Sequence, residues 1–173
     1  MANAPKVSLK PNIPSAIAVL FCVGALAGDL PDRRMTPGAL NPDVRQDNIA
    51  STVCVRGFTK TIRPPAYVTN KLKRQQIADY GYANADPRDY EEDHLVALSI
   101  GGAPADARNL WPQPRKSQWS AAKKDQLESV LYKMVCAHEI SLEQAQLAMA
   151  TDWIAAWKTY VHTGTTLRLH AVD

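Results

Sequence analysis

Asp93 and His94 place a carboxylate directly beside an imidazole in the run YEEDHLVALSIGG, which covers residues 90–102. A carboxylate is a hard ligand that suits Mg²⁺ or Mn²⁺. An imidazole titrates near neutral pH and can take a proton from water. In the following run, DARNLW, the amide of Asn109 can fix the imidazole ring by a hydrogen bond. These are the groups that metal-assisted hydrolysis of a phosphodiester needs.

The backbone must bring these groups to one place. Neighbouring residues of a regular strand point to opposite faces, so Asp93 and His94 share a site only if the strand ends or bends there. A loop at Gly101-Gly102 would then lead to a return strand that carries Asn109. These glycines do not form a phosphate-binding loop, because no Lys-Ser/Thr follows them. An Asp-His pair also occurs as a surface salt link, and this reading stays open beside the catalytic one.

Periodicity and turn residues predict the elements that must position this centre. A strand, or a strand pair, is expected over 90–100, and a second short strand over 108–111, which Pro112 and Pro114 would end. Alternating apolar and threonine residues predict a further strand at 58–62. Helices are expected at about 42–51, 69–80, 119–137 and 141–161. The sequence therefore predicts a mixed α+β fold.

The last two helices each show one apolar side. The side of the first comprises Leu127, Val130, Leu131, Met134 and Val135, and that of the second Leu147, Met149, Trp153, Ile154 and Trp157. The second helix begins at Ser141, whose spacing to Gln144 is that of a capping box. We expect the two helices to pack on each other.

At these residues the sequence resembles the HNH, or ββα-metal, endonucleases, whose first strand ends in Asp-His. The Gly-Gly loop and the Asn-Leu pair match that family's second strand, and the helix from Trp119 follows as its metal-binding helix would. The run EEDHLVALSIGG…NLWPQP…KDQLE…LYKMVC…AQLAMATDWIAAW is similar to a group of small exported bacterial HNH-like proteins. That resemblance reaches back through TPGALNP and TVCVRGFTKTIRPP, and so covers nearly all of residues 28–173.

The resemblance implies a role for each residue of the centre. Asp93 would bind a divalent metal, His94 would be the general base, and Asn109 would orient the His94 ring. The family's helix usually supplies a His or Asn as a further ligand, and Ser120 stands at that position here. A neutral hydroxyl is a weak ligand, and Asp125 lies five residues further on, where a helix points it elsewhere. A smaller departure is Ala97, where the family often has Pro.

Residues 1–27 differ in composition from the rest of the chain. Their only charged side chains are Lys6 and Lys10, and an apolar stretch from Ala16 ends at Ala25-Leu26-Ala27. This pattern is typical of a secretory signal peptide. A buried core helix and an uncleaved anchor are the alternatives, although the apolar run is shorter than the roughly 20 residues that cross a membrane. We expect one exported domain at 28–173, with the HNH-like finger at about 88–137.

Two of the three cysteines, Cys54 and Cys136, lie in the expected mature chain. An even pair in an exported protein favours a disulfide, and two buried free thiols are the alternative. Residues 28–173 carry a net charge of +1, so affinity for nucleic acid would depend on local clusters. One cluster flanks the proposed site and comprises Arg115, Lys116, Lys123 and Lys124. A second comprises Lys71, Lys73 and Arg74, and each is open to the reading of a solvated face.

The sequence therefore predicts an exported endonuclease that uses Mg²⁺ or Mn²⁺ to hydrolyse the phosphodiester bonds of DNA or RNA. Water deprotonated by His94 would attack phosphorus, and a metal on Asp93 would stabilise the transition state. The alternative is a non-catalytic HNH-like module that binds a partner, in which Asp93 and His94 serve the structure. Ser120 is the feature that favours this alternative.

Overall fold

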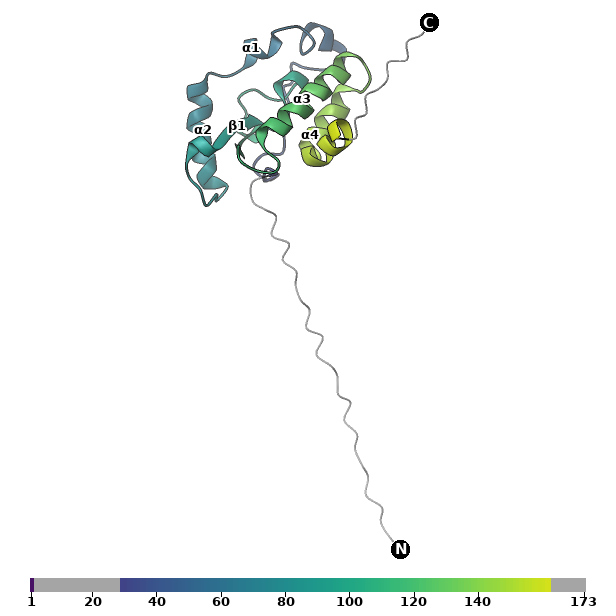
Figure 1. Cartoon of the computed structure of the whole chain (residues 1–173). Helices are drawn as coiled ribbons and strands as arrows, with labels where there is room; N and C mark the ends of the chain where they lie inside the picture. The colour runs from purple at the N-terminus through teal and green to yellow at the C-terminus, as the bar shows by residue number, and fades with distance from the viewer. Residues whose placement is uncertain (2–28, 163–173) are drawn as a thin grey trace.

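The computed structural model describes residue 1 and residues 29–162, which form one mixed α+β unit (Figure 1). Its strands are β1 (Tyr90–His94) and β2 (Leu110–Pro114), and its α-helices are α1 (Phe58–Ile62), α2 (Ala66–Asp79), α3 (Ala121–Cys136) and α4 (Leu142–Trp157). Short turns of 3-10 helix are η1 (Gln46–Ser51), η2 (Pro87–Asp89), η3 (Leu98–Ile100) and η4 (Ala107–Asn109), and a π-helical turn, η5 (Lys158–His162), follows α4. The expected α+β class is confirmed, as helices combined with a two-stranded sheet.

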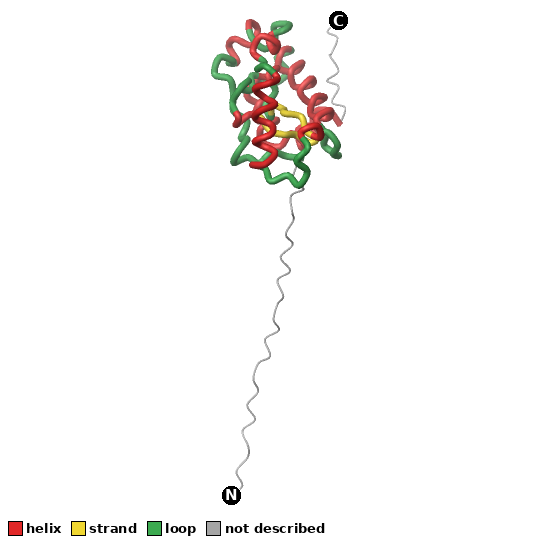
Figure 2. Tube along the Cα trace, turned by 90° about the vertical axis from the view of Figure 1, so that its left-hand side faces the viewer, coloured by secondary structure: helices red, strands yellow, loops and turns green. Residues whose placement is uncertain are grey.

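The two strands form an antiparallel hairpin at the centre of the unit, surrounded by helices (Figure 2). The expectation that Pro112 ends the second strand is wrong, because β2 continues to Pro114. Backbone N–H and C=O groups of successive residues in a strand point to alternate edges. Those of Leu110, Pro112 and Pro114, which are two residues apart, therefore point to the same edge of β2. The Leu110 carbonyl points away from β1, since it accepts hydrogen bonds from Thr36 and Gln76. Both prolines therefore lack an N–H only on the outer side of the strand, where the hairpin needs none.

The strand predicted at 58–62 is wrong, because these residues form the short helix α1. Gly57 precedes it with φ of +90°, a left-handed conformation that turns the chain into the helix. Thr61 bonds its hydroxyl to the Phe58 carbonyl, so the β-branched side chain serves a local turn rather than a sheet. The helix predicted at 42–51 is confirmed only in its second half, as η1. The helix predicted at 69–80 is confirmed as α2, which begins three residues earlier.

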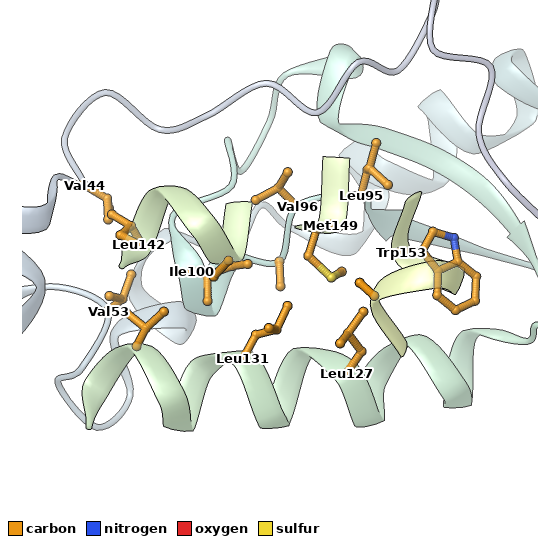
Figure 3. Packing of buried hydrophobic residues seen from close by; sticks show 14 of the residues in the cluster. Val44, Val53, Leu95, Val96, Ile100, Leu127, Leu131, Leu142, Met149 and Trp153 are labelled. Atoms are coloured by element: carbon orange, nitrogen blue, oxygen red, sulfur yellow. The ribbon is translucent and has the colours of Figure 1, made fainter. Parts of the chain in front are cut away.

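The core lies between α3, α4 and the loop that joins the two strands (Figure 3). Leu127 and Leu131 of α3 point toward Met149 of α4 and toward Ile100 of the loop, and all four are buried. The capping box that Ser141 and Gln144 were expected to form is confirmed by both of its hydrogen bonds. The expected packing of α3 on α4 is confirmed too.

One residue of the predicted apolar side of α4 is placed differently. Leu147 is 56% exposed, and the buried positions of α4 are Leu142, Ala145, Gln146, Met149, Trp153 and Ala156. The buried side thus includes the small residues Ala145 and Ala156 and the polar Gln146, which a search for large apolar side chains does not identify.

A disulfide joins Cys54 to Cys136, with 5.6 Å between the Cα atoms, as the sequence predicted. It ties the segment before α1 to the last turn of α3. Among residues 29–162, no helix is long and apolar enough to cross a membrane. The expected signal peptide at 1–27 lies outside the described residues, apart from Met1.

Replacing both cysteines, as Cys54→Ser/Cys136→Ser, should lower the free energy of unfolding by about 4 kcal/mol, because the bridge closes a long loop in the unfolded chain. Urea unfolding of both proteins, followed by circular dichroism, measures this difference. The wild type with reductant should behave like the double variant. A wild type whose stability does not change on full reduction would contradict this prediction.

Candidate active site

Asp93 and His94 lie on opposite faces of the hairpin, because both belong to the regular part of β1. Asp93 stands opposite the buried Trp111, and its carboxylate faces α3. His94 stands opposite Leu110, on the face that also carries Glu92. Figure 1 shows β1 between α2 on one side and α3 on the other. The strand therefore holds the carboxylate and the imidazole in different surroundings, without the bend that a shared site would need.

The carboxylate of Asp93 is paired with a buried ammonium group. Lys124 of α3 lies with its Nζ 2.8 Å from Asp93 Oδ2, and its side chain is 0% exposed. The same Nζ donates to the His94 carbonyl oxygen at 2.6 Å and forms an ion pair with Glu128, one turn along α3. Three oxygens thus surround one ammonium, and they belong to two elements far apart in the sequence. We call Asp93, Lys124 and Glu128 the lysine cluster.

Charge keeps this cluster together. Burial alone would lower the pKa of Lys124, but Asp93 and Glu128 outweigh it and raise that pKa above its ordinary value. The lysine is therefore charged at neutral pH. Burial raises the pKa of Glu128, an effect that Lys124 opposes and that the neighbouring Asp93 reinforces. One ammonium thus serves as the counter-ion of two carboxylates.

The residues at Asp93 do not fit a divalent metal ion. A cation bound to Asp93 would lie beside the charged Lys124, which repels it at short range in a poorly solvated place. Ser120 stands at the N-cap of α3, where it adds only a neutral hydroxyl. Asp125 occupies the neighbouring position of α3, and burial together with the charges of Asp93 and Glu91 raises its pKa. Among residues 29–162, no group of three or more His, Cys, Asp or Glu side chains is arranged to hold a metal.

The imidazole of His94 is buried and fixed by the backbone. It is 5% exposed, and its Nε2 lies 2.9 Å from the Pro104 carbonyl oxygen. A carbonyl only accepts, so Nε2 carries the proton and Nδ1 carries the lone pair of the neutral ring. Burial lowers the pKa of His94, and the nearby charges of Arg63 and Lys124 add to this, against Pro104 and Asp93. His94 is thus a neutral imidazole at pH 7.

Asn109 holds the loop that carries Pro104, rather than the His94 ring as the resemblance implies. Its Nδ2 donates to the carbonyls of Val96 and Ala103, and its Oδ1 accepts from the Val96 N–H. These bonds use both donors of the amide. A Cβ at Gly102 would lie 1.8 Å from the Val96 carbonyl and 2.7 Å from Asn109 Nδ2, so this close approach requires glycine. Asn109 and the glycine therefore shape the loop, and the loop positions His94.

The four basic residues expected to contact phosphates are placed in three ways. Arg115 pairs with Glu91, and Lys116 pairs with Asp89. Lys123 lies over the rings of Trp119 and Trp157. Lys124 is buried in the lysine cluster, so its ammonium is not available to a phosphate at the surface. Of the four basic residues, the two on α3 thus differ: Lys124 points inward, and Lys123 lies against the indole rings.

Two residues near the centre were not identified from the sequence. Arg63 follows α1, and its charge acts on both His94 and Asp125. Glu92 lies beside Asp93, and both of its carboxylate oxygens are buried without a hydrogen-bond partner among the described residues. Burial raises the pKa of Glu92 to about 8, which Lys73 opposes and Asp93 reinforces. The alternation of β1 was the available signal, because it places Glu92 and His94 on the same inward face.

Comparison of the chain with protein-family models, with curated proteins and with solved structures finds no match in any of the three.

Lys124→Met should lower the free energy of unfolding by about 3–5 kcal/mol, because it leaves Asp93 and Glu128 buried without their counter-ion. The matched control is Lys123→Met, which removes the neighbouring, partly exposed lysine and its contact with indole rings, at a cost of about 0.5–1 kcal/mol. Urea unfolding of the three proteins measures both differences. Equal losses in the two variants would contradict the buried position of Lys124.

Glu92→Gln should change how stability depends on pH. A carboxyl whose pKa rises to about 8 on folding, from an ordinary value of 4.5, weakens the fold progressively as the pH rises between these values. The variant should lack that loss and gain stability relative to the wild type, on the order of a few kcal/mol at pH 8–9. Thermal melts at pH 4 to 9 measure it, with Glu91→Gln as the control on the same strand. Parallel pH profiles of wild type and Glu92→Gln would contradict the assignment.

Proposed function

We propose that the chain is an exported, non-catalytic binding module built on an HNH-like frame, in which Lys124 takes the place that a metal on Asp93 would need. The observation that carries the proposal is the fully buried ammonium group 2.8 Å from the Asp93 carboxylate. An ion pair of this kind gives β1 and α3 a fixed contact without a metal. Asp93 then serves the structure, which is the role it has in the alternative reading of the sequence.

The order of elements supports the HNH-like part of the proposal. A strand that ends in Asp93-His94, a loop with the Asn109 contacts, a return strand and a helix follow one another as the resemblance implies. The departure lies in the helix, which presents Lys124 to Asp93. The Cys54–Cys136 disulfide supports export, because such bonds persist in oxidising compartments.

One observation favours a second candidate, the metal-dependent endonuclease. His94 is neutral, and its ring is held by the Pro104 carbonyl with Nδ1 as the basic nitrogen. A base of this kind can take a proton from an attacking water. This candidate requires Asp93 to exchange Lys124 for Mg²⁺ or Mn²⁺, and it also requires the buried His94 to become accessible to water and substrate.

The two candidates differ in the cleavage of plasmid DNA and of RNA by the purified protein. The module should leave both intact with Mg²⁺, with Mn²⁺ and with a chelator, and His94→Ala should behave in the same way. Cleavage that needs a metal and falls about 10²–10⁴-fold in a folded His94→Ala variant would overturn the module and establish the endonuclease. Circular dichroism of both proteins shows that the variant is folded.

A further inference from the structure

The positive charge of the molecule is concentrated in one stretch of the chain. Between Asp47 and Asp79 there are six basic residues and no acidic ones: Arg56, Lys60, Arg63, Lys71, Lys73 and Arg74. The rest of residues 28–173 holds 12 basic and 17 acidic residues. In the part of the chain that the structure describes, none of the six forms an ion pair, whereas most other basic side chains do. The stretch is therefore a basic segment of an otherwise acidic domain.

Within this stretch, α2 presents one exposed face. Tyr67, Lys71 and Arg74 follow one another at helical spacings of four and three residues, so they lie on one side of α2. Tyr67 is 76% exposed, and both basic residues are exposed. Lys73, by contrast, is turned toward β1 and donates to the Tyr90 carbonyl. Figure 1 shows α2 at the outer edge of the molecule, away from α3 and α4.

An open groove of about 630 Å³ runs beside this face. Lys71 and Arg74 line it from α2, and Ala105 and Ala107 line it from the loop that precedes β2. That loop also contains Pro104, whose carbonyl holds His94. The groove thus combines two basic side chains that form no ion pair with a wall that contains two alanines.

We propose that this face of α2 and its groove bind nucleic acid, with Lys71 and Arg74 on phosphates and Tyr67 against a base. The proposal rests on the proposed function, since it names the partner of the binding module. Tyr67 and Arg74 are seven residues apart, about 10 Å along a helix. Phosphates follow one another at about 3.4 Å per nucleotide along a strand, so this length matches a few nucleotides. An exposed aromatic ring beside basic residues is the arrangement that binds single strands without sequence preference.

The composition of α2 argues for nucleic acid over an anionic lipid surface. A membrane-bound helix needs a continuous apolar face rich in Trp, Phe or Leu. The large hydrophobic residues that α2 exposes are Tyr67 and Val68, and no others among the described residues of this helix. Charge therefore dominates the outer face of α2, and we expect nucleic acid to bind there mainly through its phosphates.

The test measures fluorescence anisotropy of labelled single-stranded DNA, in chelator, as a function of salt concentration. Lys71→Gln/Arg74→Gln should reduce the slope of log K against log salt by about 1.4, because each phosphate contact contributes about 0.7. The matched control is Arg33→Gln/Lys133→Gln, which removes one Arg and one Lys that are exposed elsewhere. It should keep the wild-type slope. Tyr67→Ser should weaken binding about tenfold at each salt concentration.

The outcomes separate this surface from the proposed function. Wild-type binding that the α2 variant and the control weaken equally would overturn the α2 surface and leave a nucleic-acid-binding module. No binding to DNA or RNA, with binding to vesicles of phosphatidylcholine and phosphatidylserine, would overturn nucleic acid as the partner. Cleavage of the oligonucleotide when Mg²⁺ replaces the chelator would overturn the non-catalytic function, whatever the α2 variants do.

Discussion

Lys124 joins α3 to the hairpin through its ammonium group, which contacts the carboxylates of Asp93 and Glu128 and the backbone carbonyl of His94. A buried charge is costly unless it is paired and hydrogen-bonded, and here three oxygens meet this need. The contact fixes the end of β1 against the first turns of α3. The His94 ring lies at that fixed end, and the loop with the core residues Leu95 and Val96 begins directly after it.

The loop between the strands depends on a second set of contacts, those of Asn109. Its amide binds Val96 and Ala103, and Gly102 allows the chain to pass closely. The loop then presents the Pro104 carbonyl to His94 and buries Ile100 against α3 and α4. One polar side chain thus links the core to the imidazole. This explains how residues that resemble a catalytic set also have structural roles.

The sequence predicted the parts of the fold that local patterns determine. The Ser141 capping box, the hairpin after Tyr90 and the Cys54–Cys136 disulfide are all present. The segment 58–62 is a helix and not the predicted strand, because alternation over five residues cannot distinguish a strand from a single turn of helix. That β2 continues through Pro112 and Pro114 could not be predicted, because it depends on which edge of the strand faces β1.

The candidate site was predicted in its residue types more than in its contacts. The sequence places Lys124 in a basic cluster, because nothing local shows that this helical lysine points inward to a carboxylate 31 residues earlier. The resemblance implies that Asn109 contacts the imidazole, whereas its side-chain hydrogen bonds go to the loop backbone. Such contacts depend on the register between distant elements. The basic cluster of Lys71, Lys73 and Arg74, by contrast, is evident in the sequence, and it becomes informative once α2 is seen at the surface.

The central claim is that the ammonium of Lys124, and not a metal, neutralises Asp93. The most direct measurement is the NMR signal of the Lys124 side-chain NH₃⁺ group during titration with Mn²⁺, which broadens signals of nearby nuclei. We expect a signal that is protected from exchange at neutral pH and that keeps its width when Mn²⁺ is added in excess. A signal that Mn²⁺ broadens selectively, with Asp93→Asn abolishing the effect, would show that a metal binds at Asp93 and would contradict the account.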